Sequence, residues 1–256
     1  MNILITGHKG FIGQNMVHAL QGPHHLRLYE WGDRHPSLEG LDWVIHLGAL
    51  TSTTETNVER VLCHNLEYSQ WLLGECVKHG VNLQWASSAS VYGLGQDFRE
   101  SAPVDPRTPY AWSKYLFERH ITQQGSLPIL VQGFRYFNVY GPHEDHKGDQ
   151  ASPHHRFGLQ AREQGFIEVF RGSENYVRDF VPVSQVIRTH QQFWRVPLSG
   201  VWNVGTGNPQ SFRAVAEQYG VPIVEIPMPG HLRNSYQEYT CADMTLTHRT
   251  LASSDK

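Results

Sequence analysis

A tyrosine and a lysine, Tyr110 and Lys114, stand four residues apart near the predicted start of a helix. At that spacing both side chains lie on one face of the helix. A free phenol has a pKa of about 10, and a neighbouring ammonium favours its ionised form. Tyr110 is therefore a candidate acid or base near neutral pH. Ser88 follows a predicted strand and is a candidate to hydrogen-bond the reacting hydroxyl.

A glycine-rich turn is a second candidate site. Gly7, Gly10 and Gly13 follow the apolar run 2–6 and open a predicted helix. In that context the first glycine allows a tight turn, the second lets the backbone approach a pyrophosphate, and the third lets helix and strand pack closely. The free N–H groups and the positive dipole end of the helix attract phosphate. We therefore expect a dinucleotide cofactor here.

The end of the second predicted strand bears on the choice of coenzyme. Glu30 stands there, and a carboxylate at that point accepts hydrogen bonds from a ribose 2′-hydroxyl and repels a 2′-phosphate. Arg34 lies four residues later and is the alternative, because a guanidinium can hold a 2′-phosphate. The sequence favours NAD at Glu30 and leaves NADP open.

Strands and helices alternate over the first 140 residues. We expect strands at 2–6, 26–30, 43–47, 81–86 and 128–134, and helices that end near residue 20 or span 58–79 and 109–124. This alternation is typical of an α/β protein with a parallel, doubly wound sheet. Because 201–207 (VWNVGTG) returns as a further strand, we predict a cofactor domain from 1–140 plus 181–207. Segments 141–180 and 208–256 form a predicted second lobe.

Composition restricts the class of protein. The 256 residues carry a formal net charge of −3 without a basic stripe, so we expect no nucleic-acid partner. The chain has no apolar run of the roughly 20 residues that span a bilayer and no signal-peptide pattern, so we expect no membrane partner. Three cysteines without a CxxC spacing favour reduced thiols and a cytoplasmic location. The 16 histidines lack the spaced acid or cysteine partners of metal sites, so we expect no metal.

The glycine turn, the serine loop and the tyrosine–lysine pair occur in an order and at distances that resemble the extended short-chain dehydrogenase/reductase family. The resemblance covers nearly the whole chain. It implies a Rossmann fold, a tightly bound NADP or NAD, a nucleotide-sugar substrate and a homo-oligomer that pairs through 58–79 and 109–124.

Shorter segments are more selective within the family. Residues 51–55 (TSTTE), 146–148 (HKG), 172–175 (GSEN) and 178–181 (RDFV) are similar to the ADP-glycero-manno-heptose 6-epimerases. That resemblance implies transient oxidation at C6 and return of hydride to the opposite face of the ketone. Two acid/base groups, one on each side of the sugar carbon, then match Tyr110 and Lys147. Lys114 would lower the pKa of Tyr110, and Ser88 would orient the reacting oxygen.

The resemblance also assigns the remaining site residues. The implied cofactor-binding residues are Gly7, Gly10, Phe11, Ile12, Gly13, Glu30, Leu47, Gly48, Ala49, Thr51, His64, Lys114 and Val139. The implied substrate-binding residues are Ser88, Asn138, Phe170, Arg171, Gly172, Ser173, Arg178 and Tyr236. Arg178 would grip the diphosphate, because its planar fork suits paired phosphate oxygens.

The chain departs from the family pattern at several points. Barely ten residues separate Glu30 from Leu41, where the family has a helix, a strand and further chain. His64 stands where the family has asparagine, and Arg171 replaces an acid. Two other interpretations stay open: a 4-epimerase or 4,6-dehydratase of another nucleotide sugar, or a dinucleotide-binding protein without catalysis. A dehydratase needs an acid pair beside the serine loop, and Ala89 with Ser90 supplies none.

Overall fold

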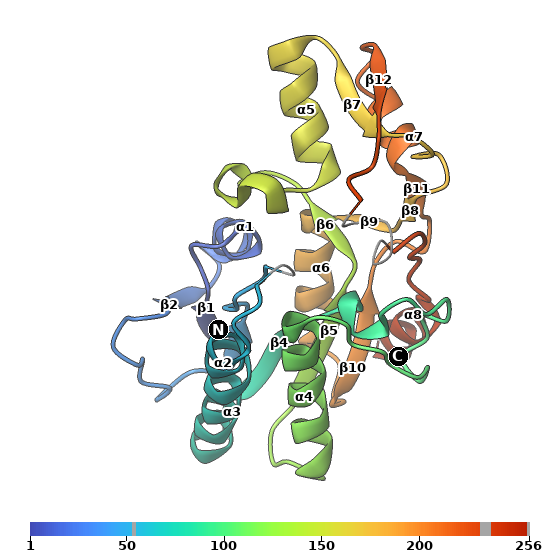
Figure 1. The fold of residues 1–256 in the computed structure, drawn as a ribbon. Helices are drawn as coiled ribbons and strands as arrows, with labels where there is room; N and C mark the ends of the chain where they lie inside the picture. The colour runs from blue at the N-terminus through green and yellow to red at the C-terminus, as the bar shows by residue number, and fades with distance from the viewer. Residues whose placement is uncertain (53–54, 231–236, 255–256) are drawn as a thin grey trace.

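The computed structural model describes residues 1–52, 55–230 and 237–254 (Figure 1). Its longer helices are α1 (Phe11–Leu20), α3 (Tyr68–His79), α4 (Pro109–Gln123), α5 (Pro153–Gln164), α6 (Val183–Phe193) and α8 (Thr245–Ser254), and its shorter ones are α2 (Val58–Leu62) and α7 (Phe212–Glu217). Within the described ranges, no helix is both long and apolar enough to cross a bilayer.

The central sheet has six strands, in the order β10-β5-β4-β3-β1-β2, and all neighbours are parallel. The strands are β1 (Asn2–Thr6), β2 (His25–Tyr29), β3 (Trp43–His46), β4 (Asn82–Ser88), β5 (Val131–Tyr136) and β10 (Gly200–Val204). β2 pairs with one side of β1, and the chain then crosses over so that β3 pairs with the other side of β1. Ligands of such sheets bind outside the carboxyl ends of the strands at this reversal. The predicted α/β doubly wound fold is confirmed.

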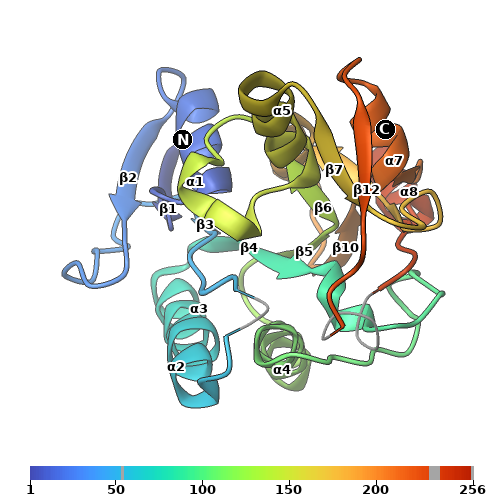
Figure 2. The same ribbon diagram turned by 45° about the horizontal axis from the view of Figure 1, so that its top comes forward.

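Helices cover both faces of the sheet (Figure 2). Ile3 and Ile5 of β1 belong to one apolar cluster with residues of α1 and α6. Leu4 points the other way, into a cluster with residues of α3 and α4. Successive side chains of a strand alternate between faces, so one short apolar run anchors both helical layers.

Segments on either side of β10 pack together beyond the carboxyl edge of the sheet (Figure 1). β7 (Ile167–Phe170) pairs in parallel with β12 (Ile223–Ile226), and α5 and α7 share an apolar cluster with β7. Smaller pairings join β6 (Asn138–Tyr140) to β9 (Phe180–Pro182) and β8 (Val177–Arg178) to β11 (Gln210–Ser211). The β7–β12 and β8–β11 pairings hold residues of 141–180 beside residues of 208–230.

Several expected elements differ from the structure in their bounds; the strand expected at 201–207, for example, spans Gly200–Val204. The helix expected over 58–79 is continuous, but residues Cys63–Glu67 form a π-helical turn, η1, between α2 and α3. The strand expected at 128–134 begins at Val131 and ends at Tyr136. Proline has no N–H to donate to a sheet, so Pro128 lies in the preceding loop.

The short connection between β2 and β3 forms neither helix nor strand over residues 30–42, all of which are described. Arg27 pins it, because its Nη1 donates to the carbonyls of Ser37 and Glu39, each at 2.9 Å. Two of its own side chains, Leu38 and Leu41, are buried in the core. β2 is consequently the edge strand of the sheet.

Candidate active site

A cavity of about 490 Å³ lies at the carboxyl ends of β1 to β5. Its wall opposite the sheet comes from the 3₁₀ segment η3 (Asp145–Gln150) and the start of α5. The predicted site residues that line it are Gly7, Gly10, Phe11, Ile12, Gly13, Glu30, Leu47, Gly48, Ala49, Thr51, Ser88, Tyr110, Lys114, Asn138, Val139 and Lys147. Residues from distant parts of the sequence therefore meet at the edge where such sheets bind ligands.

The glycine turn between β1 and α1 is too crowded for side chains at two of its glycines. A Cβ on Gly13 would lie 2.1 Å from the carbonyl oxygen of Gly7, and a Cβ on Gly7 would lie 2.5 Å from the backbone of Gly48. Gly7 also has a φ of +72°, which other residues rarely adopt. Gly10 is the N-cap of α1 and has no side-chain cap, so the first N–H groups of this helix remain available beside the cavity.

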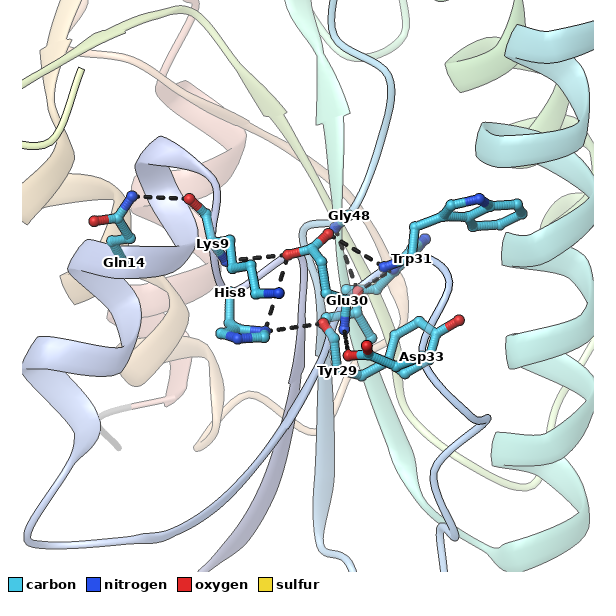
Figure 3. Close-up of polar contacts among 10 residues, drawn as sticks. His8, Lys9, Gln14, Tyr29, Glu30, Trp31, Asp33 and Gly48 are labelled. Carbon is cyan, nitrogen blue, oxygen red and sulfur yellow. Dashed lines mark hydrogen bonds and ion pairs between the residues drawn. The ribbon is translucent and has the colours of Figure 1, made fainter. Parts of the chain in front are cut away.

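Glu30 lies at the end of β2 against the glycine turn (Figure 3). Its carboxylate accepts hydrogen bonds from the backbone N–H of Lys9 at 3.1 Å and of Trp31 at 3.3 Å. The Nδ1 of His8 is 3.9 Å from the same carboxylate. Asp33 accepts from the Glu30 N–H at 3.0 Å, so a second carboxylate lies nearby. This corner of the cavity suits hydroxyl donors better than an added phosphate.

Ser88, Tyr110 and Lys114 line the same cavity. Thr108 caps α4 by accepting from the N–H of Ala111 at 3.1 Å, which starts the helix so that Tyr110 and Lys114 share a face. The Lys114 Nζ lies 5.7 Å from the centroid of the Tyr110 ring. Burial lowers the pKa of Lys114 from 10.5 to about 8.

The pKa of Tyr110 differs from the expectation that Lys114 would lower it. Burial raises the pKa of this phenol, and a hydrogen bond with Ser88 offsets the rise only in part. A desolvated phenolate is costly, and Lys114 does not compensate that cost here. In the protein by itself, Tyr110 is therefore a proton donor rather than a ready base.

His64 does not line the cavity, although the resemblance placed a cofactor contact there. Its ring stacks on Trp31, with 3.8 Å between ring centroids. The next residue, Asn65, is buried. Its side-chain oxygen accepts from the Leu50 N–H at 2.8 Å, and its amide nitrogen donates to the Leu50 carbonyl at 3.0 Å and to the Ser113 hydroxyl at 3.1 Å. The π-helical turn brings Asn65 inward, so this asparagine ties the loop after β3 to α4. The sequence analysis did not single out Asn65, which follows the predicted His64 directly.

A buried polar chain runs from Tyr136 and was not predicted. Gln132 donates to the carbonyls of Phe193 and Val196, so its oxygen accepts from Gln84. The oxygen of Gln84 then accepts from His190 Nδ1 at 2.8 Å, which leaves His190 Nε2 to accept from the Tyr136 hydroxyl. Burial lowers the pKa of His190 to about 3, so the imidazole is neutral. The chain fixes the Tyr136 phenol in the cavity wall.

Lys147 reaches the cavity from η3. Its Nζ is 3.6 Å from a carboxylate oxygen of Glu144 and 4.9 Å from the centroid of the Phe11 ring. Burial lowers the pKa of Lys147, and Glu144 opposes that shift. Lys147 is thus a half-buried ammonium in the cavity wall opposite the sheet.

The predicted substrate residues divide between two places. Asn138 lines the first cavity, whereas Phe170 and Ser173 line a second one, of about 270 Å³, with residues of α5 and β12. Arg171 and Gly172 line neither.

Arg178 is buried and also lines neither cavity. It donates to the carbonyls of Val177 and Gln237 and lies over the ring of Phe212. Tyr236, together with positions 53–54 of the TSTTE segment, falls outside the described residues.

Comparison with known proteins gives consistent relatives. Residues 24–205 match the model of the NAD dependent epimerase/dehydratase family. The ADP-L-glycero-D-manno-heptose-6-epimerase of Helicobacter pylori is 24% identical with a TM-score of 0.86, over 98% of this chain and 90% of that chain. The UDP-N-acetylglucosamine 4-epimerase of Methanobrevibacter ruminantium is 21% identical with a TM-score of 0.87, over 98% and 91%. The UDP-glucose 4-epimerase of Thermus thermophilus, solved with NAD, is 27% identical with a TM-score of 0.79, over 98% and 93%.

The family model covers most of the chain, including β3, β4, β5, β10 and the tyrosine–lysine pair on α4. The solved relatives share the fold over nearly all of it. This chain belongs to the NAD-dependent epimerase/dehydratase family, whose members among its structural relatives act on nucleotide sugars.

Proposed function

We propose that the protein is a nucleotide-sugar epimerase that inverts C6 of ADP-glycero-manno-heptose with a bound NAD-type cofactor. The observation that supports this most is that Tyr110 and Lys147 line the same cavity from two different elements, α4 and η3. In the proposed inversion at C6, the ketone binds in a flipped orientation before hydride returns, so its oxygen needs a second proton-transferring group away from Tyr110.

The residues present fit an NAD-type dinucleotide. Gly10 offers the uncapped start of α1 to a pyrophosphate, and no acidic side chain occupies the first turn of that helix. Bound in this cavity, the nicotinamide would supply a reversible acceptor of hydride. We infer NAD rather than NADP, because Glu30 and Asp33 place two carboxylates where a 2′-phosphate would lie.

Tyr110, Ser88 and Lys114 form one half of the proposed mechanism. The Tyr110 hydroxyl exchanges a proton with the sugar hydroxyl, and Ser88 holds the same oxygen by a hydrogen bond. Lys114 would hold the nicotinamide ribose, and its ammonium would favour the phenolate together with the positive charge of the oxidised cofactor. Burial alone raises the pKa of Tyr110, so the pair needs that added charge to act as a base.

Lys147 forms the other half. When the ketone binds in the flipped orientation, the Lys147 Nζ gives a proton to the oxygen as hydride returns to the opposite face. Burial has already lowered the pKa of this ammonium, which eases proton transfer to an alkoxide and back.

We further propose that 1–140 plus 181–207 form the cofactor domain, and that 141–180 plus 208–256 bind the nucleotide, with Phe170 and Ser173 in the second cavity. Homo-oligomerisation through α3 and α4 completes the proposal, and light scattering from the purified protein would test it.

Replacement of Lys147 tests the proposal. Purified wild-type protein incubated with ADP-D-glycero-D-manno-heptose should give both C6 epimers, separated by anion-exchange chromatography. Lys147→Met should lower the rate about 10²–10⁴-fold, the usual contribution of one acid/base group. Lys78→Met is the control, because Lys78 is an exposed lysine on α3 that pairs with Glu75. An unimpaired rate in Lys147→Met would contradict the assignment.

A 4-epimerase is the second candidate, favoured by the 27% identity to the Thermus thermophilus enzyme. Inversion at C4 of a UDP-sugar needs Tyr110 but not Lys147. Interconversion of UDP-glucose and UDP-galactose that survives Lys147→Met, together with inactivity toward the ADP-heptose, would select this alternative.

A further inference from the structure

Glu144 is a carboxylate with no exposed surface at the start of the loop that carries Lys147. One of its oxygens accepts from the Gly141 N–H at 3.0 Å and the Ser152 hydroxyl at 2.7 Å. The other accepts from the Ser152 N–H at 2.6 Å and lies 3.6 Å from the Lys147 Nζ. One side chain thus joins both ends of residues 141–152 and the lysine in their middle.

A buried carboxylate is costly unless it is paired and hydrogen-bonded. Three hydrogen bonds and the Lys147 ammonium stabilise the buried Glu144 carboxylate. Removal of either Glu144 or Lys147 would therefore leave the other without its charged partner. The backbone repeats the link, because the Lys147 N–H donates to the Glu144 carbonyl at 2.9 Å. The loop is also held to α1, where Asn15 donates to the Pro142 carbonyl at 2.8 Å.

We propose that Glu144 is the positioning residue for Lys147: its carboxylate fastens the loop against the cavity and holds the Lys147 side chain there as an ammonium. This inference rests on the proposed function only in treating Lys147 as the second acid/base group. It adds that the wall opposite the sheet is built around one acid, so loop position and lysine charge depend on the same group.

Other charged groups lie near this loop, and their placement makes Glu144 the dominant one. Asp145 is 90% exposed and pairs with His155 at 3.7 Å, away from the cavity. Other titratable groups near the lysine include His143, His146 and Asp149 on the loop, His154 on α5, and Tyr110 and Lys114 across the cavity. Glu144 is the charged group that acts on Lys147 in the described residues.

The test measures the charge of Lys147 directly and needs no substrate. Folded protein is labelled with trace acetic anhydride from neutral to alkaline pH, and modification of Lys147 is read by mass spectrometry of its peptide. Glu144→Gln should lower the pH midpoint of labelling by about one unit or more, because an anion held close to a half-buried ammonium is lost. Asp145→Asn is the matched control, and it should leave the midpoint nearly unchanged because exposed charges are screened.

Glu144→Asp covers the case in which the glutamine variant does not fold. Aspartate keeps the charge but is one methylene shorter, so the midpoint should fall by a smaller amount. A midpoint that stays in place or rises in the folded variants would overturn the proposal, since a purely structural role for Glu144 would not move it.

Failure of the inference and failure of the proposed function give different results. If the midpoint falls in Glu144→Gln but wild-type protein does not epimerise ADP-D-glycero-D-manno-heptose, then Glu144 positions Lys147 and the proposed substrate is wrong. If wild-type protein epimerises it and the midpoint does not move, the positioning role is wrong. If both proposals are right, Glu144→Gln should also shift the alkaline limb of the epimerisation rate to lower pH by the same amount.

Discussion

Two helical glycines offer a matched pair that tests the cofactor turn. An added Cβ at Gly13, in α1, would lie 2.1 Å from the Gly7 carbonyl oxygen and 2.8 Å from the His8 Cα. Ordinary contact begins at 3.4 Å, so in Gly13→Ala the backbone of the turn must move by more than about 1 Å. At Gly74, in α3, an added Cβ would meet nothing within 4 Å.

The two substitutions should affect different quantities, binding in Gly13→Ala and stability in Gly74→Ala. A misplacement of about 1 Å in a site that positions a ligand costs about 100-fold, or about 2.7 kcal/mol of binding free energy. Gly13→Ala should therefore weaken NAD binding by about 100-fold. Gly74→Ala should leave binding unchanged and stabilise the fold by about 0.5–1 kcal/mol, because alanine restricts the unfolded helix segment more than glycine does.

Fluorescence titration with NADH measures the binding, and a thermal melt measures stability. For a protein of this size, 1 kcal/mol shifts Tm by about 2–4 °C, so Gly74→Ala should melt a few degrees higher. If Gly13→Ala bound NADH within a few-fold of wild type and melted at the same temperature, the turn would not be as rigid as the close contacts imply, and the assignment of the pyrophosphate to it would lose its main support.

Three further predictions concern charge. Glu30→Ser should raise affinity for NADPH relative to NADH about tenfold, measured by parallel fluorescence titrations; an unchanged ratio would remove Glu30 from coenzyme selection. Lys114 has a pKa lowered from 10.5 to about 8, so the unfolded chain binds its proton more tightly, and stability should rise as pH climbs from about 8 toward 10.5. Lys114→Met should raise stability at pH 7 by up to about 3 kcal/mol and flatten that rise in thermal melts; melts with the wild-type slope would count against it. Glu118→Gln leaves the buried Arg135 guanidinium without the carboxylate that accepts two of its bonds, and urea denaturation should show a loss of about 3–5 kcal/mol, against little change for Glu75→Gln on the surface.

The buried pair of Glu118 and Arg135 also explains how the site is aligned. Glu118 on α4 accepts from Arg135 on β5 and from the Ser87 hydroxyl at 2.6 Å. Because Ser87 precedes Ser88 on β4, one carboxylate fixes the relative positions of the serine loop and the helix that carries Tyr110. Ser87, Glu118 and Arg135 lie far apart in the sequence, and no local sequence pattern predicts their contact.

The sequence was sufficient for features that depend on neighbours along the chain. Apolar runs such as 2–6 and 43–47 need only be buried on both faces to become central strands, and Gly7, Gly10 and Gly13 need only a strand before and a helix after. The four-residue spacing of Tyr110 and Lys114 likewise fixes a shared helix face. These patterns predicted the parallel α/β fold, and the resemblance to the family that they carry supplied most of the predicted residues that line the cavity.

Only the tertiary structure decided what depends on groups distant in sequence. Lys147 has no helix or strand pattern around it, and the buried Glu144 that bonds to both ends of residues 141–152 lies 3.6 Å from its Nζ. The π-helical turn that sends Asn65 inward and His64 outward, and the raised pKa of Tyr110, arise from packing and desolvation. Burial and electrostatics act through space, so the residues that set them need not be close along the chain.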